Sequence, residues 1–537
     1  MMQAAEAMVK CLELEGIKVV YGYPGAAICP FYDKLFDSGI HHVLVRHEVN
    51  AGHAANGYAR ITGKPAVCTA TSGPGALNLI TAVATAYMDS VPVIFITGQV
   101  STDQIGSDVF QEADITGAVM PFIKHSYLVK NAADIPRIFK EAFYIAGTGR
   151  KGPVLIDVPI DVQKTQIDFF YPETISMRTY KPTVKGNPFQ LKKIAESLSR
   201  AEKPLICAGG GVFLANAREA LVDFTEKTGI PAVTTMMGVS LFPSDHPLYY
   251  GMIGMHGQPT ANEAVSRCDT IILLGARAGD RAVTAPGFLE KSKQIIHIDI
   301  DPAEIGKNVA VDLPLVGDCG NILKELSELV ESGDYSQWKQ ELSEVKNHIP
   351  TEEETGGFVN PKLFLRCLSE IMPDDTICVA DVGQNQIWTC TNFLIKKGRL
   401  LVNGGMGTMG YAIPAAIGAK MAFPDSEVVA VCGDGGFQMQ MMELATIMQE
   451  KLPVKIILMK NNRLGMVREL QTKIYQDRQA AVRLKGSPDF VELVRSYGIP
   501  AERVETMAEA KTAAQRMKDA KGPYFIECNV YKYETSL

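Results

Sequence analysis

The sequence lacks the marks of a membrane, secreted or nucleic-acid-binding protein. No uninterrupted apolar run approaches the roughly 18 residues of a membrane-spanning helix. Residues 1–20 contain acidic side chains and lack the apolar core of a signal peptide. The formal net charge of −7 gives no reason to expect a nucleic acid or an anionic membrane as a partner.

The cysteines do not follow a pairing pattern either. The eleven cysteines are scattered and odd in number, and they form no Cys-x-x-Cys pair. This usage favours reduced, mostly buried thiols in a cytoplasmic protein over disulfides or a zinc site.

What the sequence does contain is the pattern of a large α/β protein. A chain of 537 residues, 46% of them hydrophobic, is long enough for about three domains. Short apolar runs alternate with helical patterns, which predicts parallel, doubly wound sheets. We expect three Rossmann-like domains at residues 1–165, 191–335 and 360–537, with a linker of rising proline and polar content at 166–190.

Strands are predicted where apolar runs end at glycine or at a polar residue. In the first domain these runs are Ile17–Tyr21, His42–Val45, Ala66–Thr69, Val91–Thr97 and Val154–Val158. In the second they are Pro204–Ala208, Ala232–Thr235, Thr270–Leu274 and Gln294–Asp299, with a charged helical stretch, Ile322–His348, after them. In the third they are Thr376–Ala380, Val428–Cys432, Val454–Met459 and Tyr524–Cys528. The first and third domains are expected to be distant structural cousins, although the sequence shows no clear internal repeat.

Two buried strands of the third domain end in polar turns that carry candidate ligands. The run Val428–Cys432 is followed by Gly433-Asp434-Gly435, and the run Val454–Met459 is followed by Lys460-Asn461-Asn462-Arg463, with one helix between. The carboxyl ends of parallel strands emerge at one sheet edge, where ligands bind in open α/β sheets. We therefore expect the two turns to lie close together.

The residue types at these turns suit a magnesium ion and a diphosphate. Asp434 offers a carboxylate oxygen and Asn461 an amide oxygen, and hard oxygen ligands of low total charge suit Mg²⁺ that is also held by phosphates. Glycines at 433, 435 and 436 let the backbone approach a diphosphate at a helix N-terminus. The alternative is an ordinary tight turn, but the interval of 27 residues between Asp434 and Asn461 favours the metal site.

This pair resembles the diphosphate and metal motif of thiamine diphosphate enzymes. The resemblance implies that Asp434, Asn461 and the main-chain oxygen of Arg463 bind the metal, with Gly433, Gly435 and Gly436 at the cofactor. Aligned on the following Leu464-Gly465-Met466, the sequence has Lys460 where the family has its first asparagine. Asn462 is the alternative ligand.

In the first domain, Glu48 ends the run Val45-Arg46-His47-Glu48 and opens a helix. A glutamate stabilised by a helix N-terminus is the alternative interpretation. The resemblance implies instead that Glu48 binds N1′ of the cofactor pyrimidine and so promotes loss of the C2 proton. In the family, the first domain of one chain and the third domain of another share a site, so at least a homodimer is expected.

Two further motifs belong to the same resemblance. Met409, preceded by Gly407, matches the apolar residue that supports the bent cofactor, although a core methionine is the alternative. The turn Tyr23-Pro24-Gly25 matches a cofactor-binding turn of the first domain.

Several longer motifs narrow the resemblance to the catalytic subunit of acetohydroxyacid (acetolactate) synthase. They are Tyr21 to Ala27, Gly106 to Glu112, Gly254 to Gly257, His297 to Asn308 and Leu464 to Arg468. Members of this family decarboxylate pyruvate and join the remaining two-carbon unit to pyruvate or 2-oxobutanoate, in branched-chain amino acid biosynthesis. The resemblance implies catalytic roles for Glu48, Phe110, Gln111 and Arg281, the last as the group that binds the second oxoacid.

The same resemblance implies FAD in the middle domain, where it is largely structural. The residues carried over as FAD-binding are Gly209, Gly210, Gly211, Met255, His256, Gly257, Gly275, Arg277, Asp280, Asp299 and Asp318. An empty crevice in a vestigial domain is the alternative.

The sequence departs from the family at three more positions. The segment around Ala278, Gly275 to Arg281, lacks a phenylalanine and one aspartate that the family has there. Ile160 replaces a lysine at the substrate entrance, and Leu470 replaces a tryptophan tied to preference for 2-oxobutanoate. A smaller side chain at 470 predicts weaker discrimination between acceptors.

Two other functions stay open from the sequence. One is a different thiamine enzyme, such as a pyruvate oxidase or decarboxylase. The other is a cofactor-binding protein without turnover, against which the presence of Glu48, Asp434 and Asn461 argues. The family also implies a tetramer and a small regulatory subunit as possible assemblies, with 2-oxoacids as the small-molecule partners.

Overall fold

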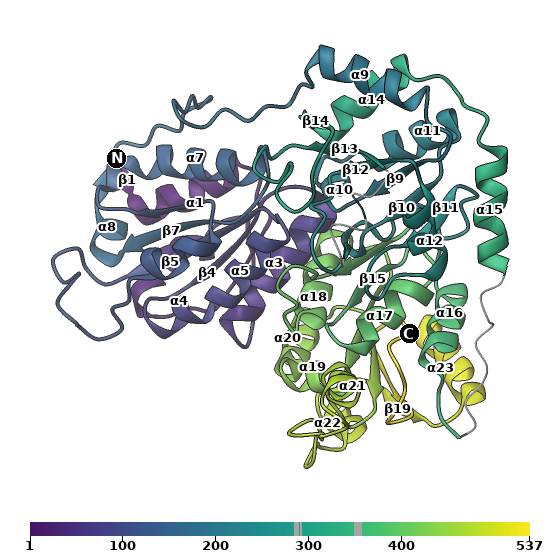
Figure 1. Cartoon of the computed structure of the whole chain (residues 1–537). Coiled ribbons are helices and arrows are strands. Elements are labelled where there is room, and N and C mark those ends of the chain that lie inside the picture. Colours follow the sequence, from purple (N-terminus) through teal and green to yellow (C-terminus); the bar gives the residue numbers. More distant parts are fainter. Residues whose placement is uncertain (284–288, 290–292, 348–356) are drawn as a thin grey trace.

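Three six-stranded, all-parallel sheets with flanking helices build the protein (Figure 1). The computed structural model describes residues 1–283, 289, 293–347 and 357–537. The predicted fold class of three doubly wound α/β domains is confirmed. No helix in the described ranges is long and apolar enough to cross a membrane.

The first domain has strands β2 to β7 in one sheet. The strands are β2 (Val19–Gly22), β3 (His41–Leu44), β4 (Ala66–Ala70), β5 (Val93–Gln99), β6 (His125–Leu128) and β7 (Val154–Pro159). The helices are α1 (Ala4–Leu14), η1 (Ala26–Ile28), α2 (Cys29–Phe36), α3 (Glu48–Thr62), α4 (Pro74–Asn78), α5 (Ile80–Met88), α6 (Ile115–Val119), η2 (Met120–Phe122), η3 (Ala132–Asp134), α7 (Ile135–Gly147) and α8 (Ile160–Lys164). A short antiparallel pair, β1 (Met2–Gln3) and β8 (Gln166–Ile167), lies beside it.

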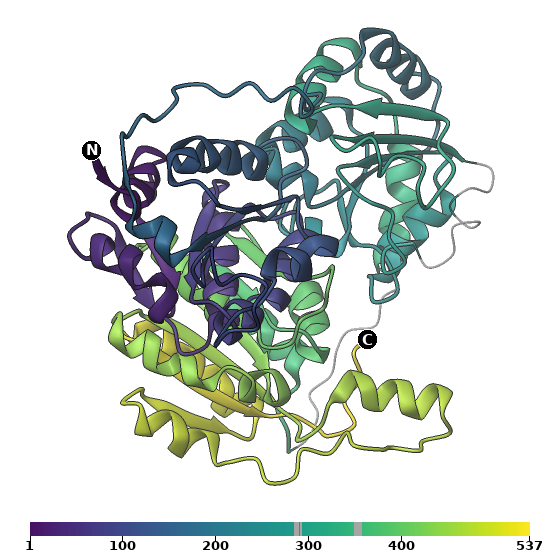
Figure 2. The same ribbon diagram turned by 90° about the vertical axis from the view of Figure 1, so that its left-hand side faces the viewer.

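The middle domain follows a segment without helix or strand, residues 168–187 (Figures 1 and 2). Its strands are β9 (Pro204–Ala208), β10 (Ala232–Thr234), β11 (Tyr249–Met252), β12 (Thr270–Leu274), β13 (Gln294–Asp299) and β14 (Leu313–Val316). Its helices include α9 (Pro188–Leu198), α10 (Gly211–Leu214), α11 (Arg218–Thr228), η4 (Met236–Gly238), α12 (Pro259–Arg267), α14 (Cys319–Leu329) and α15 (Ser336–Asn347). The predicted helical stretch 322–348 is thus two helices, and His348 lies outside the described residues.

The third domain contains strands β15 to β20. They are β15 (Ile377–Ala380), β16 (Arg399–Val402), β17 (Val428–Gly433), β18 (Val454–Lys460), β19 (Ala501–Val504) and β20 (Tyr524–Asn529). The helices are α16 (Pro361–Ile371), α17 (Gln384–Asn392), α18 (Ala412–Ala422), α19 (Asp434–Gln438), η5 (Met441–Glu443), α20 (Leu444–Gln449), α21 (Gly465–Ile474), α22 (Phe490–Ser496) and α23 (Met507–Asp519).

Strand order shows that the first and third domains share one topology. Their sheets run β3-β2-β4-β5-β7-β6 and β16-β15-β17-β18-β20-β19, which is the same permutation of chain order. The middle sheet runs β11-β10-β9-β12-β13-β14, the order found in dinucleotide-binding folds. The expected kinship of the first and third domains is confirmed, and the middle domain differs from both.

Within the three six-stranded sheets, five of the described strands were not predicted from the sequence, and all five lie at sheet edges: β6, β11, β14, β16 and β19. Edge strands face solvent on one side, so they do not need a continuous apolar run. Their sequences are accordingly interrupted by polar residues, by Gly251 or by Pro314.

The first and third domains pack against each other through α3 and α18 (Figures 1 and 2). Glycines allow the close approach, because a Cβ at Gly57 would overlap the carbonyl of Ala415 and one at Gly418 would overlap the carbonyl of Ala54. One hydrophobic core therefore spans the first and third domains.

Candidate functional site

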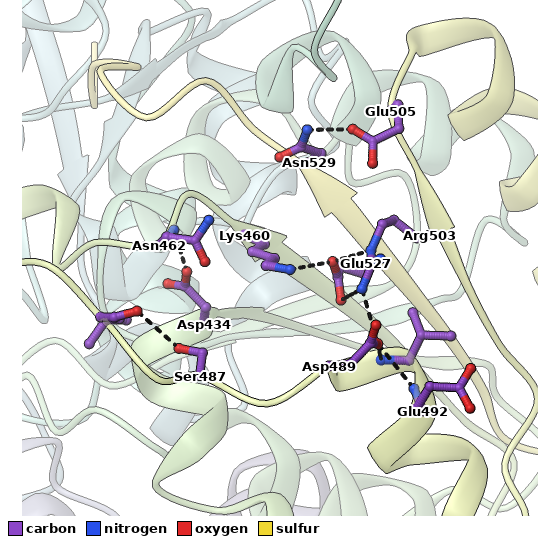
Figure 3. Close-up of polar contacts among 12 residues, drawn as sticks. Asp434, Lys460, Asn462, Ser487, Asp489, Glu492, Arg503, Glu505, Glu527 and Asn529 are labelled. Atoms are coloured by element: carbon purple, nitrogen blue, oxygen red, sulfur yellow. Dashed lines mark hydrogen bonds and ion pairs between the residues drawn. The ribbon is translucent and has the colours of Figure 1, made fainter.

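The two polar turns of the third domain meet at the carboxyl edge of its sheet, as expected. Strands β17 and β18 are hydrogen-bonded neighbours, with Gly433 opposite Met459. The Asn462 backbone N–H donates to Asp434 Oδ2 at 2.6 Å (Figure 3). The Gly435 N–H donates to Asp434 Oδ1 at 3.0 Å. The chain direction also reverses its winding next to this point, between β15 and β17, where ligands bind in open sheets.

The Asp434 carboxylate has the electrostatics of a cation ligand. Its side chain is almost fully buried, and burial raises its pKa to about 7 even though backbone N–H groups of Asn462, Gly435 and Asn461 oppose the shift. A divalent cation would stabilise the charged form. Within the described ranges no cluster of three or more His, Cys, Asp or Glu residues could hold a metal, so a cation here would need amide, main-chain and phosphate oxygens as well.

The two candidate asparagines, Asn461 and Asn462, differ in burial and in hydrogen bonding. Asn461 is 8% exposed, its Oδ1 accepts from the Arg463 backbone N–H at 2.9 Å, and its Nδ2 donates to Gln384 Oε1 at 3.0 Å. Asn462 is exposed and has a φ of 56°, in the left-handed region. The Asn461 amide is therefore buried and held on both of its polar atoms, whereas Asn462 is exposed to solvent.

The side chain of Lys460 points to the neighbouring strand β20 and pairs with a buried acid there. Its Nζ donates to Oε1 of the fully buried Glu527 at 2.8 Å, and Arg503 Nε donates to the same oxygen at 2.6 Å (Figure 3). The lysine charge is thus compensated on the neighbouring strand β20, so it does not occupy the place of a cation at Asp434.

The loop that carries Gly407 and Met409 reaches the same crevice. A Cβ added at Gly435 would lie 3.2 Å from Met409 Cε, so this methionine borders the glycine turn. Asp381, just after β15, anchors the loop by accepting from the Gly410 N–H at 2.8 Å and the Ala412 N–H at 3.0 Å. Gly407 is exposed with a φ of 65°.

Glu48 and Gln111 border one turn of the first domain. Glu48 is the first residue of α3, and its Oε2 accepts from Asn78 Nδ2 at 3.0 Å. A Cβ at Gly75 would lie 3.3 Å from Glu48 Oε1, and one at Gly73 would lie 2.8 Å from the Gln111 carbonyl oxygen. The glycines after β4 therefore keep both predicted residues close together.

Other predicted residues of the first domain lie on the same edge of the sheet. Tyr23-Pro24-Gly25 follows β2, the neighbour of β3 and β4, and a Cβ at Gly25 would overlap Thr71. Phe110 is 87% exposed and projects from the surface of this single chain.

The predicted glycines of the middle domain form its switch-point crevice. Gly209-Gly210-Gly211 follows β9 and Gly275 follows β12, and these two strands lie where the winding reverses. The Gly211 N–H donates to the Gly275 carbonyl at 3.0 Å, and any Cβ at Gly209 or Gly211 would overlap Gly275. Arg277 follows in the same turn.

The predicted acids of the middle domain divide into two groups. Asp299 ends β13, accepts from the Asp301 N–H at 2.9 Å, and has its pKa raised to about 6 by burial. Asp318 caps α14, because its Oδ1 accepts from the N–H groups of Gly320 and Asn321. One oxygen of each acid thus accepts from backbone N–H groups, and Asp299 is the buried one of the two.

Arg281 and the Met255-His256-Gly257 segment pack together beside the third domain. The Met255 N–H donates to the Arg281 carbonyl at 3.0 Å. Burial and the Arg281 charge lower the pKa of His256, while Glu469 of α21 opposes that shift. Arg281 and Asp280 are both exposed, and Arg281 Nε lies 3.7 Å from Asp280 Oδ2.

Sequence reasoning missed the residues that support Asn461. Gln384, at the start of α17, accepts from Asn461 and donates to Glu469 and to the Glu534 carbonyl, the latter at 2.7 Å. Glu469 also accepts from the Ser536 hydroxyl at 2.8 Å. The available signal was the position of Gln384 after a predicted strand, Thr376–Ala380, next to Val428–Cys432.

Among the described residues, the predicted ones of the first and third domains do not bond to each other directly within one chain. In the part of the chain that the structure describes, no hydrogen bond or ion pair joins Glu48 to Asp434 or Asn461, and the Glu48 bond goes to Asn78 of its own domain.

Comparisons with known proteins give one consistent family. Three family descriptions match: "Thiamine pyrophosphate enzyme, N-terminal TPP binding domain" over residues 2–118, "central domain" over 191–326, and "C-terminal TPP binding domain" over 381–528. The Methanocaldococcus jannaschii protein "Probable acetolactate synthase large subunit" is 46% identical over 98% of this chain and 91% of its own length. The acetolactate synthase large subunit of Corynebacterium glutamicum is 44% identical over 96% of this chain and 85% of its own length.

A third relative, an acetolactate synthase of Arthrospira platensis, is 42% identical over 99% of this chain and 94% of its own length. Similarity at this level covers all three sheets and both halves of the predicted site. The chain is therefore a member of the acetolactate synthase large-subunit family of thiamine pyrophosphate enzymes.

Proposed function

We propose that this protein is an acetolactate (acetohydroxyacid) synthase, which decarboxylates pyruvate and joins the two-carbon unit to pyruvate or 2-oxobutanoate. The observation that carries this proposal is the near-full-length similarity to acetolactate synthases, combined with Glu48 and the Asp434–Asn461 pair at the carboxyl edges of two domains of the same topology. The role is in branched-chain amino acid biosynthesis.

The third domain would hold the cofactor diphosphate and its metal. Asp434, Asn461 and the main-chain oxygen of Arg463 would bind Mg²⁺, and the backbone at Gly433, Gly435 and Gly436 would contact the diphosphate. The buried carboxylate with its raised pKa fits this donor set, because a cation would compensate the charge that burial disfavours. When bound, thiamine diphosphate supplies the carbon nucleophile that attacks a 2-oxoacid.

The first and middle domains would supply the remaining groups. Glu48 would exchange a proton with the pyrimidine N1′, and Gln111 beside the Gly73 turn would orient the substrate. Arg281 carries an exposed guanidinium suited to the carboxylate of the second oxoacid, and Phe110 would cover the acceptor pocket. Exclusion of water by these groups would favour ligation over protonation.

The middle domain would bind FAD at its switch point. The backbone of Gly209–Gly211 and Gly275 would receive the diphosphate, and Asp299 would accept from a ribose hydroxyl. The position of both glycine turns at the switch point of the sheet supports this proposal. The flavin would serve as a structural group, since the proposed reaction has no net redox change.

We infer a homodimer as the minimal assembly and a tetramer as a possible larger one. The lack of a direct hydrogen bond or ion pair between Glu48 and Asp434 in the described part of one chain is compatible with a site shared between two chains. Relatives are named large subunits, which supports a small partner subunit. The described cysteines, all unpaired, support a reducing, cytoplasmic location.

Incubation with pyruvate, thiamine diphosphate, Mg²⁺ and FAD tests the proposal. Acetolactate is the expected product, and acetohydroxybutyrate should appear when 2-oxobutanoate is added. Acetaldehyde or peroxide as the sole product would identify another thiamine enzyme, and absence of any product from folded, cofactor-loaded protein would identify a binding protein without turnover.

A further inference from the structure

A buried carboxylate of the third domain is hydrogen-bonded to the strand-to-helix junction that carries Glu48. Glu443, the last residue of η5, has no exposed surface. Its Oε1 accepts from the Arg46 backbone N–H and from Asn50 Nδ2, both at 2.8 Å. Arg46 lies two residues before Glu48 and Asn50 two residues after it, so one oxygen holds both sides of the first turn of α3.

Further hydrogen bonds around this junction come from one face of the η5–α20 segment. Thr446 Oγ1 donates to Glu443 Oε2 at 2.6 Å, and Gln449 Oε1 accepts from Arg46 Nη2 at 3.0 Å. These three residues are three positions apart and therefore share a face. Arg46 Nη1 also donates to the Leu44 carbonyl at 2.8 Å, which ties the end of β3 to the same contact.

Burying a carboxylate at this place costs free energy unless hydrogen bonds compensate for its lost hydration. Burial raises the pKa of Glu443, and its partners are a hydroxyl, an amide and a backbone N–H rather than a bound ion pair. What a carboxylate provides is acceptor capacity on both oxygens. The geometry uses this capacity to hold the strand-to-helix junction of the first domain against the third.

We propose that Glu443 is a positioning residue for Glu48: its hydrogen bonds to Arg46 and Asn50 fix the first turn of α3 in the register that places the Glu48 carboxylate beside Gly75. This inference rests on the proposed function, in which Glu48 exchanges a proton with the cofactor. Small displacements of a reacting group lower rates strongly, so a loosened turn should slow that exchange.

The chain offers a matched control on the same interface. Glu450, after the end of α20, accepts from His41 Nε2 at 2.7 Å. This contact also joins a third-domain carboxylate to β3, but it lies at the opposite end of the strand from Glu48. Glu443→Ala, Glu443→Gln and Glu450→Ala therefore separate the proposed positioning role from general interdomain packing.

The experiment measures deuterium exchange at C2 of thiamine diphosphate bound to the full-length protein with Mg²⁺, together with cofactor affinity, thermal unfolding and kcat and KM for pyruvate. In Glu443→Ala the exchange rate and kcat should fall about tenfold or more, with little change in KM. Glu443→Gln keeps the Oε1 acceptor and should stay within about threefold of wild type. Glu450→Ala should leave exchange unchanged.

Wild-type exchange in Glu443→Ala, or an equal loss in Glu450→Ala, would overturn the inference. If Glu443→Ala does not fold, Asn50→Ala removes one of the two donors, and wild-type exchange in that variant would overturn it as well. Glu48→Gln in the same assay separates the two levels. Unchanged exchange there would refute the proposed role of Glu48, whereas slow exchange there with normal exchange in Glu443→Ala would refute only the role of Glu443.

Discussion

Asp434→Asn is expected to stabilise the metal-free protein while removing its metal binding. Burial raises the pKa of Asp434 from 3.8 to about 7, so the folded state holds a proton that the unfolded state has lost between these values. Stability therefore falls as pH rises from about 4 to 7, and the full cost is present above pH 7. A difference of about three pKa units corresponds to about 4 kcal/mol.

The substitution has a cost of its own. The two Asp434 oxygens accept from different N–H groups, those of Gly435 and Asn462, and an asparagine can serve only one of them. An unpaired buried N–H costs about 1–3 kcal/mol. The net expectation at pH 8 is that metal-free Asp434→Asn is more stable than wild type by about 1–3 kcal/mol.

The assay is thermal unfolding of both proteins without metal at pH 5 and pH 8, with a Mg²⁺ and thiamine diphosphate titration alongside. The difference in unfolding temperature between the variant and wild type should favour the variant more at pH 8 than at pH 5. Mg²⁺ should raise the unfolding temperature of wild type but not that of the variant. In wild type, metal affinity should weaken about tenfold per pH unit below pH 7, because the proton must leave before the cation binds. An Asp434→Asn protein less stable than wild type at pH 8, or a metal affinity independent of pH from 5.5 to 7, would refute the reasoning.

Three further outcomes are expected. Glu48→Gln should bind thiamine diphosphate normally yet lose most turnover, as compared by cofactor titration and acetolactate assay; full turnover would exclude it as the proton-exchanging group. Leu470→Trp should raise the ratio of acetohydroxybutyrate to acetolactate in a mixed-substrate assay. Leu470 is 49% exposed on α21, and the larger ring would narrow the proposed acceptor pocket. An unchanged ratio would show that residue 470 does not line that pocket. Lys460→Asn should lower the free energy of unfolding by about 1–3 kcal/mol, because Glu527 loses one of its two cationic partners and keeps Arg503. The variant should still form acetolactate. Inactivity of the folded, metal-bound variant would show that Lys460 acts in the site.

Much of the fold could be predicted because central strands of parallel sheets are continuous apolar runs. The runs at 204–208, 270–274 and 294–299 match β9, β12 and β13 residue for residue. The edge strands could not be predicted in this way, because one side of β6 or β19 faces solvent and its sequence is polar.

The candidate site was predictable where its chemistry lies in contiguous motifs. Asp434 and Asn461 were expected side by side because each follows a strand of one sheet, and the structure places them there. Gln384 was not expected, because it contacts Asn461 from 77 positions away in the chain. Their roles in binding a cofactor remain predictions that the experiments above test.

The sequence by itself determined the family, the three α/β domains and the residue types at the strand ends, because strand, turn and helix signals are local and survive in short stretches of chain. Only the tertiary structure decided that Lys460 is neutralised by Glu527, that Asn461 rather than Asn462 is buried, and that Glu443 holds the turn before α3. Each of these depends on side chains that are distant in sequence and meet only after the sheets have packed, so their pairing is set by burial and hydrogen bonding in the folded protein.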